Sequence, residues 1–479
     1  MRRNLLLGSI SLLACICLLF PPSLTHGVEK TDIDARGTVL VDGRPRLILG
    51  FYEYPSEPVK LEELAESGYN LIRVSGPEQL DRLGELDVYG WICVSVEIEE
   101  GDQAAADRLA AKIDAAKDHP ALLVWELPDE CLWNVWHRRE GWVHGGEAQA
   151  LLERVAAAEA TEEQKAAWRA AVDKANHLKG RALYEQSAAL YDSVWEALGS
   201  ENPGSGRRFA TCEADSIALA ERMRRGCELV RSRDPQRLIW QNHAPRNSIP
   251  SLGRFNEYVD AVGCDIYPAP FAFAGHSDLT DQTISSVGAY TRRMQVGAPG
   301  KSCWMVLQGF GWPDIHDYPE AKAAAGRRPT WEETRFMAYD ALVNGADAIL
   351  YWGTHSIEKD SPLWNDLMRI GRELRGLERL LVGEDAARPP ECVAGETFGS
   401  IDPEDGPKLL LRRDGDDWLL LAVNERNTPV PFTVRGLPGE LEGRNLRRLS
   451  VEETVTVKNG AFSDGIARFG VHVYLSEPR

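Results

Sequence analysis

The chain has 479 residues, 43% of them hydrophobic, and a formal net charge of -19. This length allows one large domain and a smaller one, each with its own hydrophobic core. The acidic balance argues against nucleic acid and anionic membrane surfaces as partners, and leaves neutral and cationic ligands open. The sequence also contains no P-loop and no dinucleotide-binding glycine fingerprint, which disfavours nucleotide chemistry.

Residues 1–27 have the three-part layout of a secretory signal peptide: two arginines, an apolar run from Leu5 to Phe20, and a short polar end. We therefore expect a secreted or periplasmic protein. A lipoprotein cleavage box ending at Cys15 is the alternative, but the apolar run continues past this cysteine, which disfavours a lipid anchor. No later segment is apolar over the ~20 residues that a membrane-spanning helix needs.

From Arg46 onward, short apolar runs alternate with amphipathic segments, a pattern typical of parallel strands joined by helices. Eight such units predict an α/β fold, a (β/α)8 TIM barrel, over residues 28–388. The expected strands are 46–52, 70–75, 91–98, 121–127, 237–243, 261–268, 303–310 and 348–353.

The connection after the fourth strand is much longer than the others and covers about residues 131–212. Its Ala-, Glu- and Lys-rich sequence has helical periodicity, which predicts a helical hairpin. Because it follows a barrel strand, this insertion starts on the face where barrel enzymes build their active sites. The sequence is compatible with a roof over a cleft and with a solvated decoration.

Beyond Pro389 the sequence changes to short alternating stretches separated by Asp-Gly and Asn-Gly turns. This pattern predicts an antiparallel β-sandwich domain over residues 389–479. The cysteines show no CxxC spacing, and no cluster of side chains has the spacing of a metal motif. We expect neither a metal nor another cofactor, and the oligomeric state is open.

The fourth expected strand ends in WELPDE, residues 125–130. Polar residues at this end of a barrel strand point into the reaction space, which places Asp129 and Glu130 there. A carboxylic acid with a raised pKa can protonate a glycosidic oxygen, which is otherwise a poor leaving group. Asp129 would raise the pKa of Glu130 by like-charge repulsion. The pair predicts general acid catalysis; the alternative is an exposed acidic turn.

WELPDE also resembles the strand-four motif W-E-L-x-N-E of the clan A glycoside hydrolases, which include mannanases and cellulases. The resemblance implies that Glu130 is the general acid/base and that Asp129 stands where the family has a sugar-binding asparagine. Strand ends matching the family, together with other polar and aromatic residues at strand ends, give the expected sugar contacts. They are Arg73, Tyr267, Gln308, His243, Trp352, Trp125 and Tyr52.

The seventh strand departs from the family. It reads WMVLQGFGW, with Gln308 where the resemblance implies the nucleophilic glutamate, and an amide is not a carboxylate nucleophile. One hypothesis is that another strand-end acid takes this role: Asp265, Glu97 or Glu53. The distance between the carboxyls would then distinguish a retaining from an inverting mechanism.

Two further hypotheses do not need a second catalytic carboxylate. A 2-acetamido group of the substrate attacks the anomeric carbon while Asp129 orients it, as adjacent Asp-Glu pairs do in some N-acetylhexosaminidases. Alternatively, the protein is a secreted glycan-binding protein without turnover. We favour an exported glycoside hydrolase that cleaves O-glycosidic bonds, with Asp265 or the acetamido oxygen as the partner of Glu130.

Overall fold

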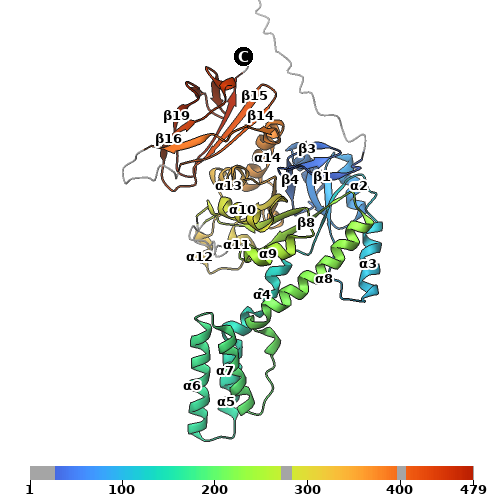
Figure 1. Cartoon of the computed structure of the whole chain (residues 1–479), viewed down its shortest axis with the longest axis vertical. Coiled ribbons are helices and arrows are strands. Elements are labelled where there is room, and N and C mark those ends of the chain that lie inside the picture. The colour runs from blue at the N-terminus through green and yellow to red at the C-terminus, as the bar shows by residue number, and fades with distance from the viewer. Residues whose placement is uncertain (1–26, 271–282, 396–405, 478–479) are drawn as a thin grey trace, which may run out of the picture.

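The computed structural model describes residues 27–270, 283–395 and 406–477 (Figure 1). The expected signal peptide, with Cys15, lies almost entirely outside these ranges. Within them, no helix is both long and apolar enough to cross a membrane.

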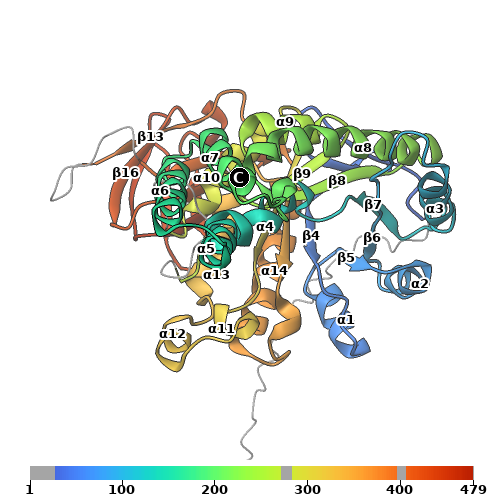
Figure 2. The same cartoon turned by 90° about the horizontal axis from the view of Figure 1, so that it is seen from below.

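Eight parallel strands close into a barrel in the order β10-β11-β4-β5-β6-β7-β8-β9, with helices around them (Figure 2). All eight predicted strands are present, which confirms the predicted fold class. The strands are β4 (Ile48–Phe51), β5 (Leu71–Val74), β6 (Tyr89–Cys93), β7 (Leu122–Glu126), β8 (Leu238–His243), β9 (Ala261–Ile266), β10 (Ser302–Gln308) and β11 (Ala348–Trp352).

Each barrel strand is followed by a helix that packs around the barrel. For β7 this helix comes only at the end of the insertion. These helices are α1 (Pro58–Glu66), α2 (Pro77–Glu85), α3 (Gln103–Asp114), α8 (Cys212–Arg233), α9 (Ile249–Asn256), α10 (Ser286–Gly297), α13 (Trp331–Val343) and α14 (Pro362–Leu381). Shorter helices follow β10 and β11 on the catalytic face of such barrels: α11 (Trp312–Ile315), α12 (Glu320–Ala325) and a 3-10 turn over Thr354–Ser356.

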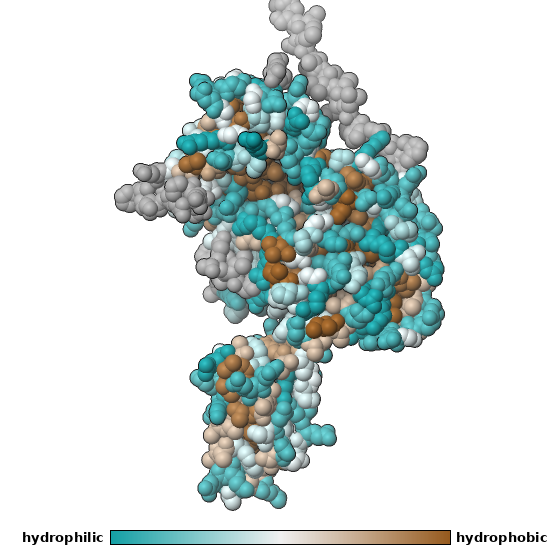
Figure 3. All heavy atoms as spheres, in the orientation of Figure 1, coloured by the Kyte–Doolittle hydropathy of each residue, from teal (hydrophilic) through white to brown (hydrophobic). Residues whose placement is uncertain are grey.

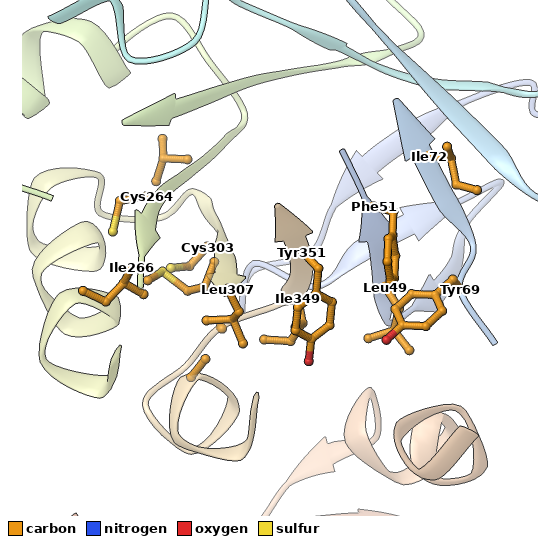
Figure 4. Packing of buried hydrophobic residues seen from close by; sticks show 14 of the residues in the cluster. Leu49, Phe51, Tyr69, Ile72, Cys264, Ile266, Cys303, Leu307, Ile349 and Tyr351 are labelled. Atoms are coloured by element: carbon orange, nitrogen blue, oxygen red, sulfur yellow. The ribbon is translucent and has the colours of Figure 1, made fainter. Parts of the chain in front are cut away.

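Side chains along each barrel strand alternate between two cores, as the pleat of a strand requires. Outward-facing residues such as Phe51 and Tyr351 pack against the helices (Figure 4). Inward-facing residues fill the barrel, where the ring of Trp240 lies 5.7 Å from that of Trp91 and 5.4 Å from that of Trp304. Much of the tryptophan content is therefore structural.

A small antiparallel sheet that the sequence did not predict packs at the N-terminal ends of the barrel strands. It consists of β1 (Thr31–Ile33), β2 (Val39–Val41) and β3 (Arg44–Arg46), and its valines join the inner core of the barrel. Arg46 belongs to β3, so the first barrel strand begins at Ile48, later than expected. Strands of three residues are too short for period-two alternation to stand out in a sequence.

The insertion contains a three-helix bundle, so the predicted helical hairpin is wrong. It comprises α4 (Cys131–Gly141), a π-helical turn (Trp142–Gly146), α5 (Glu147–Ala157), α6 (Glu162–Lys179) and α7 (Tyr184–Ala197). The long second helix of the expected hairpin is interrupted after Gly180, where Ala182 adopts a φ of 58°. Helices α5–α7 enclose their own apolar core and project from the barrel beyond a narrow waist (Figures 1 and 3).

The C-terminal region forms two antiparallel sheets around one core, as predicted. Arg335 of α13 donates a hydrogen bond of 3.0 Å to the backbone oxygen of Val471, which ties the larger sheet to the barrel helices. The larger sheet is β12 (Glu384–Asp385), β14 (Lys408–Asp414), β15 (Asp417–Val423), β20 (Val471–Ser476), β17 (Asn445–Arg448) and β18 (Thr454–Thr456). The smaller sheet is β13 (Glu391–Ala394), β16 (Val430–Arg435) and β19 (Phe462–Ile466).

Candidate active site

Three carboxylates meet at the C-terminal ends of β7 and β9. Asp129 and Glu130 follow β7, and Asp265 lies in β9. Asn242, from β8 between them, donates hydrogen bonds through Nδ2 to Asp129 Oδ1 at 2.8 Å and to Asp265 Oδ1 at 2.5 Å. The two accepting oxygens are therefore no farther apart than the sum of these two distances. One amide holds both aspartates in a fixed arrangement.

Glu130 occupies the turn between β7 and α4 in a left-handed conformation, with φ 49° and ψ 26°. A residue other than glycine in this region costs roughly 1–2 kcal/mol, so the surroundings must hold it there. The Glu130 N–H donates to Asn242 O at 3.4 Å, and the N–H of Asn134 donates to Glu130 O at 3.0 Å. Strain of this kind concentrates at functional sites.

The cluster retains protons at neutral pH. Burial raises the pKa of Glu130 to about 7, and the charge of Asp129 contributes to this rise. Burial also raises the pKa of Asp129, and it raises that of Asp265 well above the usual range, with both neighbouring carboxylates adding to the effect. Three carboxyls this close do not all ionise together near neutral pH. The cluster can therefore supply a proton, as a general acid must.

Asp265 is the candidate for the second carboxylate that the structure brings to Glu130. Its Oδ2 accepts a hydrogen bond of 2.8 Å from the Tyr267 hydroxyl, so both of its oxygens have protein donors. Glu53 is instead bound to Lys359, with Nζ 2.8 Å from Oε2. Glu97 is exposed and belongs to a neighbouring cleft.

The three carboxylates line a cleft of about 550 Å³, together with several aromatic side chains. The rings of Tyr267 and Trp352 are stacked there, with centroids 5.5 Å apart and planes 19° apart. Trp312, His316 and His355 complete this aromatic wall. Flat rings beside a proton donor form the kind of surface on which a sugar ring packs.

Two of the expected sugar contacts are wrong because their side chains face outward from the barrel. Trp125 is fully buried, and its Nε1 donates a hydrogen bond of 2.8 Å to Asp234 Oδ2. His243 is also fully buried, with Nε2 2.7 Å from Asn256 Oδ1, and burial lowers its pKa to about 4. Both residues stabilise the packing of helices on the barrel.

The expectation for Gln308 is also wrong, for a different reason. It faces inward, but its amide is fully used by the backbone of the loops after β9 and β10. Nε2 donates to Ala269 O at 2.6 Å and to Phe310 O at 3.0 Å, while Oε1 accepts from Ala269 N at 2.9 Å. Gln308 thus links the backbone of the loops after β9 and β10. The side chain at the position that the resemblance assigns to the nucleophile therefore has a structural role and is not available to attack a substrate.

Arg73 and Tyr52 line a separate cleft of about 390 Å³, and their role as sugar contacts stays a prediction. Arg73 Nε lies 3.0 Å from Oε2 of Glu126, a fully buried carboxylate that sequence reasoning did not select. Burial raises the pKa of Glu126 to about 8, although Arg73 opposes this rise. Alternation along β7 could have identified Glu126, because it shares the inward face with Val124.

Among the residues that the structure describes, no group of three or more His, Cys, Asp or Glu side chains is arranged to hold a metal ion.

No protein-family model matches the chain, and no curated protein matches it. Several solved structures share its fold. A beta-galactosidase from Bacillus circulans sp. alkalophilus is 10% identical with a TM-score of 0.50, over 90% of this chain and 99% of that one. A catalytic mutant of Gan42B, a GH42 beta-galactosidase from G. stearothermophilus, gives the same identity and score over 90% and 98%. A structure titled "Glycoside hydrolase" is 12% identical with a TM-score of 0.50, over 93% and 96%. At these identities the likeness establishes the fold.

Proposed function

We propose that the protein is an exported glycoside hydrolase that cleaves O-glycosidic bonds of oligo- or polysaccharides, with Glu130 as general acid/base. The observation that carries this proposal is the cluster itself. A half-buried glutamate whose pKa is raised to about 7 stands beside two further carboxyls in one cleft with stacked aromatic rings. The fold supports it, since structures of the same architecture are titled beta-galactosidase and glycoside hydrolase. Export rests on the N-terminal sequence.

The chemistry follows from the arrangement of the carboxyls. Protonated Glu130 donates its proton to the glycosidic oxygen while the bond to the anomeric carbon breaks. Positive charge develops on that carbon, and Asp265 stabilises it in the form of the coupled cluster in which Glu130 holds the proton and Asp265 is ionised, a form that the hydrogen bonds from Asn242 and Tyr267 favour. Asn242 and Tyr267 hold the two oxygens of Asp265 in place, so little reorganisation is needed at that moment. Glu130, now ionised, then accepts a proton from the water that completes hydrolysis.

A second candidate is the substrate-assisted cleavage of 2-acetamido sugars, and one observation favours it. Gln308 occupies the nucleophile position on β10, and its amide is bound to backbone. The carboxylate of Asp129, next to Glu130 in the chain, accepts a hydrogen bond from Asn242. In this version the acetamido oxygen attacks the anomeric carbon, Asp129 accepts the acetamido N–H, and Glu130 protonates the leaving group. Only 2-acetamido sugars would then be cleaved.

The test is to incubate the protein with a panel of neutral, charged and 2-acetamido oligosaccharides beside four variants. These are Glu130→Gln, Asp265→Asn, Asp129→Asn and, as a control on an exposed helix, Glu66→Gln. Sugar release by the wild type and the control, but not by Glu130→Gln, supports hydrolysis with Glu130 as the acid.

The two aspartate variants separate the two mechanisms. Loss with Asp265→Asn on ordinary glycosides supports the relocated carboxylate. Cleavage confined to 2-acetamido sugars and lost with Asp129→Asn supports substrate assistance. No release from any saccharide, with binding retained by wild type and Glu130→Gln, would refute the hydrolase proposal in favour of a glycan-binding protein.

A further inference from the structure

A second and larger cleft, of about 790 Å³, adjoins the carboxylate cluster, and Asp129 lines both clefts. Its walls come from the turn after β7, from α4 and α8, and from the 3-10 turns Ser205–Arg207 and Phe209–Thr211. These elements form the waist between the barrel and the three-helix bundle (Figures 1 and 3). The base of the insertion is therefore a wall of this cleft, whereas the bundle projects beyond it.

Four arginines line this cleft, in a chain whose net charge is -19. Two of them are neutralised. Arg139 is ion-paired with Asp215, and Arg222 has its Nε 3.3 Å from Oε1 of Glu99 and its Nη2 3.7 Å from Oε2 of Glu97. The other two, Arg138 and Arg207, are exposed.

Arg138 on α4 and Arg207 in the 3-10 turn make no ion pair within the described part of the chain. The guanidinium of Arg207 lies over the ring of Trp142, 6.0 Å from its centroid. Arg222 has two carboxylate partners, so four carboxylates balance the formal charge of the four arginines. These carboxylates are Glu97, Glu99, Asp129 and Asp215. This arginine cleft is therefore neutral overall, but it presents two guanidinium groups that have no carboxylate partner among the described residues.

We propose that Arg138 and Arg207 of this arginine cleft bind the anionic groups of a saccharide chain whose neighbouring sugars occupy the aromatic cleft beside Glu130. Guanidinium groups recognise carboxylates and sulfates through paired hydrogen bonds, so the substrate class is an acidic glycan bearing uronate carboxylates or sulfate esters. The proposal deepens the hydrolase function and rests on it for cleavage, but the binding itself can be measured alone. The overall charge favours neutral and cationic ligands, and the two unpaired guanidinium groups make this cleft a local exception.

The experiment measures binding by titration calorimetry in the Glu130→Gln background, where no cleavage interferes. The probes are a short oligogalacturonate with its methyl-esterified counterpart, and a sulfated galactan oligosaccharide with its desulfated counterpart. The cleft variant adds Arg138→Gln and Arg207→Gln. The matched control adds Arg108→Gln and Arg181→Gln, which remove the same charge from exposed arginines of α3 and of the turn between α6 and α7.

We expect the Glu130→Gln protein to bind an acidic probe more tightly than the neutral counterpart of that probe. The cleft variant should bind the acidic probe about tenfold more weakly than the Glu130→Gln protein does, and the control variant should bind it equally well. Added salt should weaken the binding, because the contacts are ionic and partly exposed. The two pairs of probes show whether the cleft binds uronate carboxylates or sulfate esters. Equal binding of acidic and neutral probes, or equal losses in both double variants, would overturn the proposal.

The two proposals can fail separately. Arginine-dependent binding of an acidic glycan, without sugar release by the wild type from any saccharide, would support the binding role of the arginine cleft and refute the hydrolase. Efficient hydrolysis of neutral saccharides without any preference for acidic ones would support the hydrolase and refute the binding role of the arginine cleft.

Discussion

Replacing Glu130 by glutamine should make the protein more stable at alkaline pH while abolishing its activity. The fold holds this carboxyl where burial and Asp129 raise its pKa to about 7 from 4.5. One pKa unit corresponds to ~1.36 kcal/mol, so ionising Glu130 in the folded state costs up to about 3 kcal/mol. Removing one of three coupled carboxyls also lets the others titrate differently, and we expect a net gain of about 2 kcal/mol.

The sign of the pH dependence follows from the raised pKa. Below pH 4.5 the carboxyl is protonated in both the folded and the unfolded chain, so the wild type and the variant have equal stability there. Between pH 4.5 and about 7 the unfolded chain releases the proton first, and the wild type loses stability relative to the variant. Above about 7 the difference is constant.

Thermal unfolding of both proteins at pH 4 and pH 8 measures this effect without any substrate. We expect equal Tm values at pH 4 and a Tm higher by a few degrees for Glu130→Gln at pH 8. Glu66→Gln, on an exposed helix position, should match the wild type at both pH values. A Glu130→Gln variant that is no more stable than the wild type at pH 8 would refute this reasoning, because it would show that the folded cluster does not raise the pKa of Glu130.

Three further substitutions test the roles assigned to individual side chains. Gln308→Glu replaces a donor to two backbone carbonyls by an acceptor, so we expect a loss of about 2–5 kcal/mol in thermal unfolding and no gain of activity. Asn242→Ala removes the amide between the two aspartates; kcat should fall about 10²-fold, and the pH–rate profile should shift because the cluster rearranges. Trp125→Phe removes one buried hydrogen bond to a carboxylate, which should destabilise the protein by about 1.5–3 kcal/mol in denaturant unfolding while leaving KM unchanged.

The barrel was predictable because its strands are continuous apolar runs at regular spacing, and because parallel strands bring their C-terminal ends to one face. For this reason Asp129, Glu130 and Asp265 could be selected from sequence, and the structure places them together. Tyr267 and Trp352 meet in the same cleft by the same logic.

The errors have two physical origins. One is the alternation of side chains along a strand. His243 is next to the inward-facing Asn242, and Trp125 is next to the inward-facing Glu126. An error of one residue therefore assigns to the site a side chain that is buried on the outer face of the barrel. The other is tertiary context. The backbone that uses the amide of Gln308 comes partly from another loop, distant in sequence.

The arginine cleft could not be predicted from the sequence, because it also depends on tertiary context. Arg138 and Arg207 are far apart along the chain and meet because the insertion returns to the barrel through α8. Overall charge reports on the whole surface and does not describe one cleft.

The most direct test of the central claim is the leaving-group dependence of Glu130→Gln. Aryl glycosides of the sugar identified by the saccharide panel would be compared, because a dinitrophenolate leaves without protonation and a simple phenolate does not. If Glu130 is the general acid, kcat/KM should fall by about 10²–10⁴ for the poor leaving group and by much less for the activated one. Equal losses for both substrates, or no loss for either, would contradict its role as proton donor.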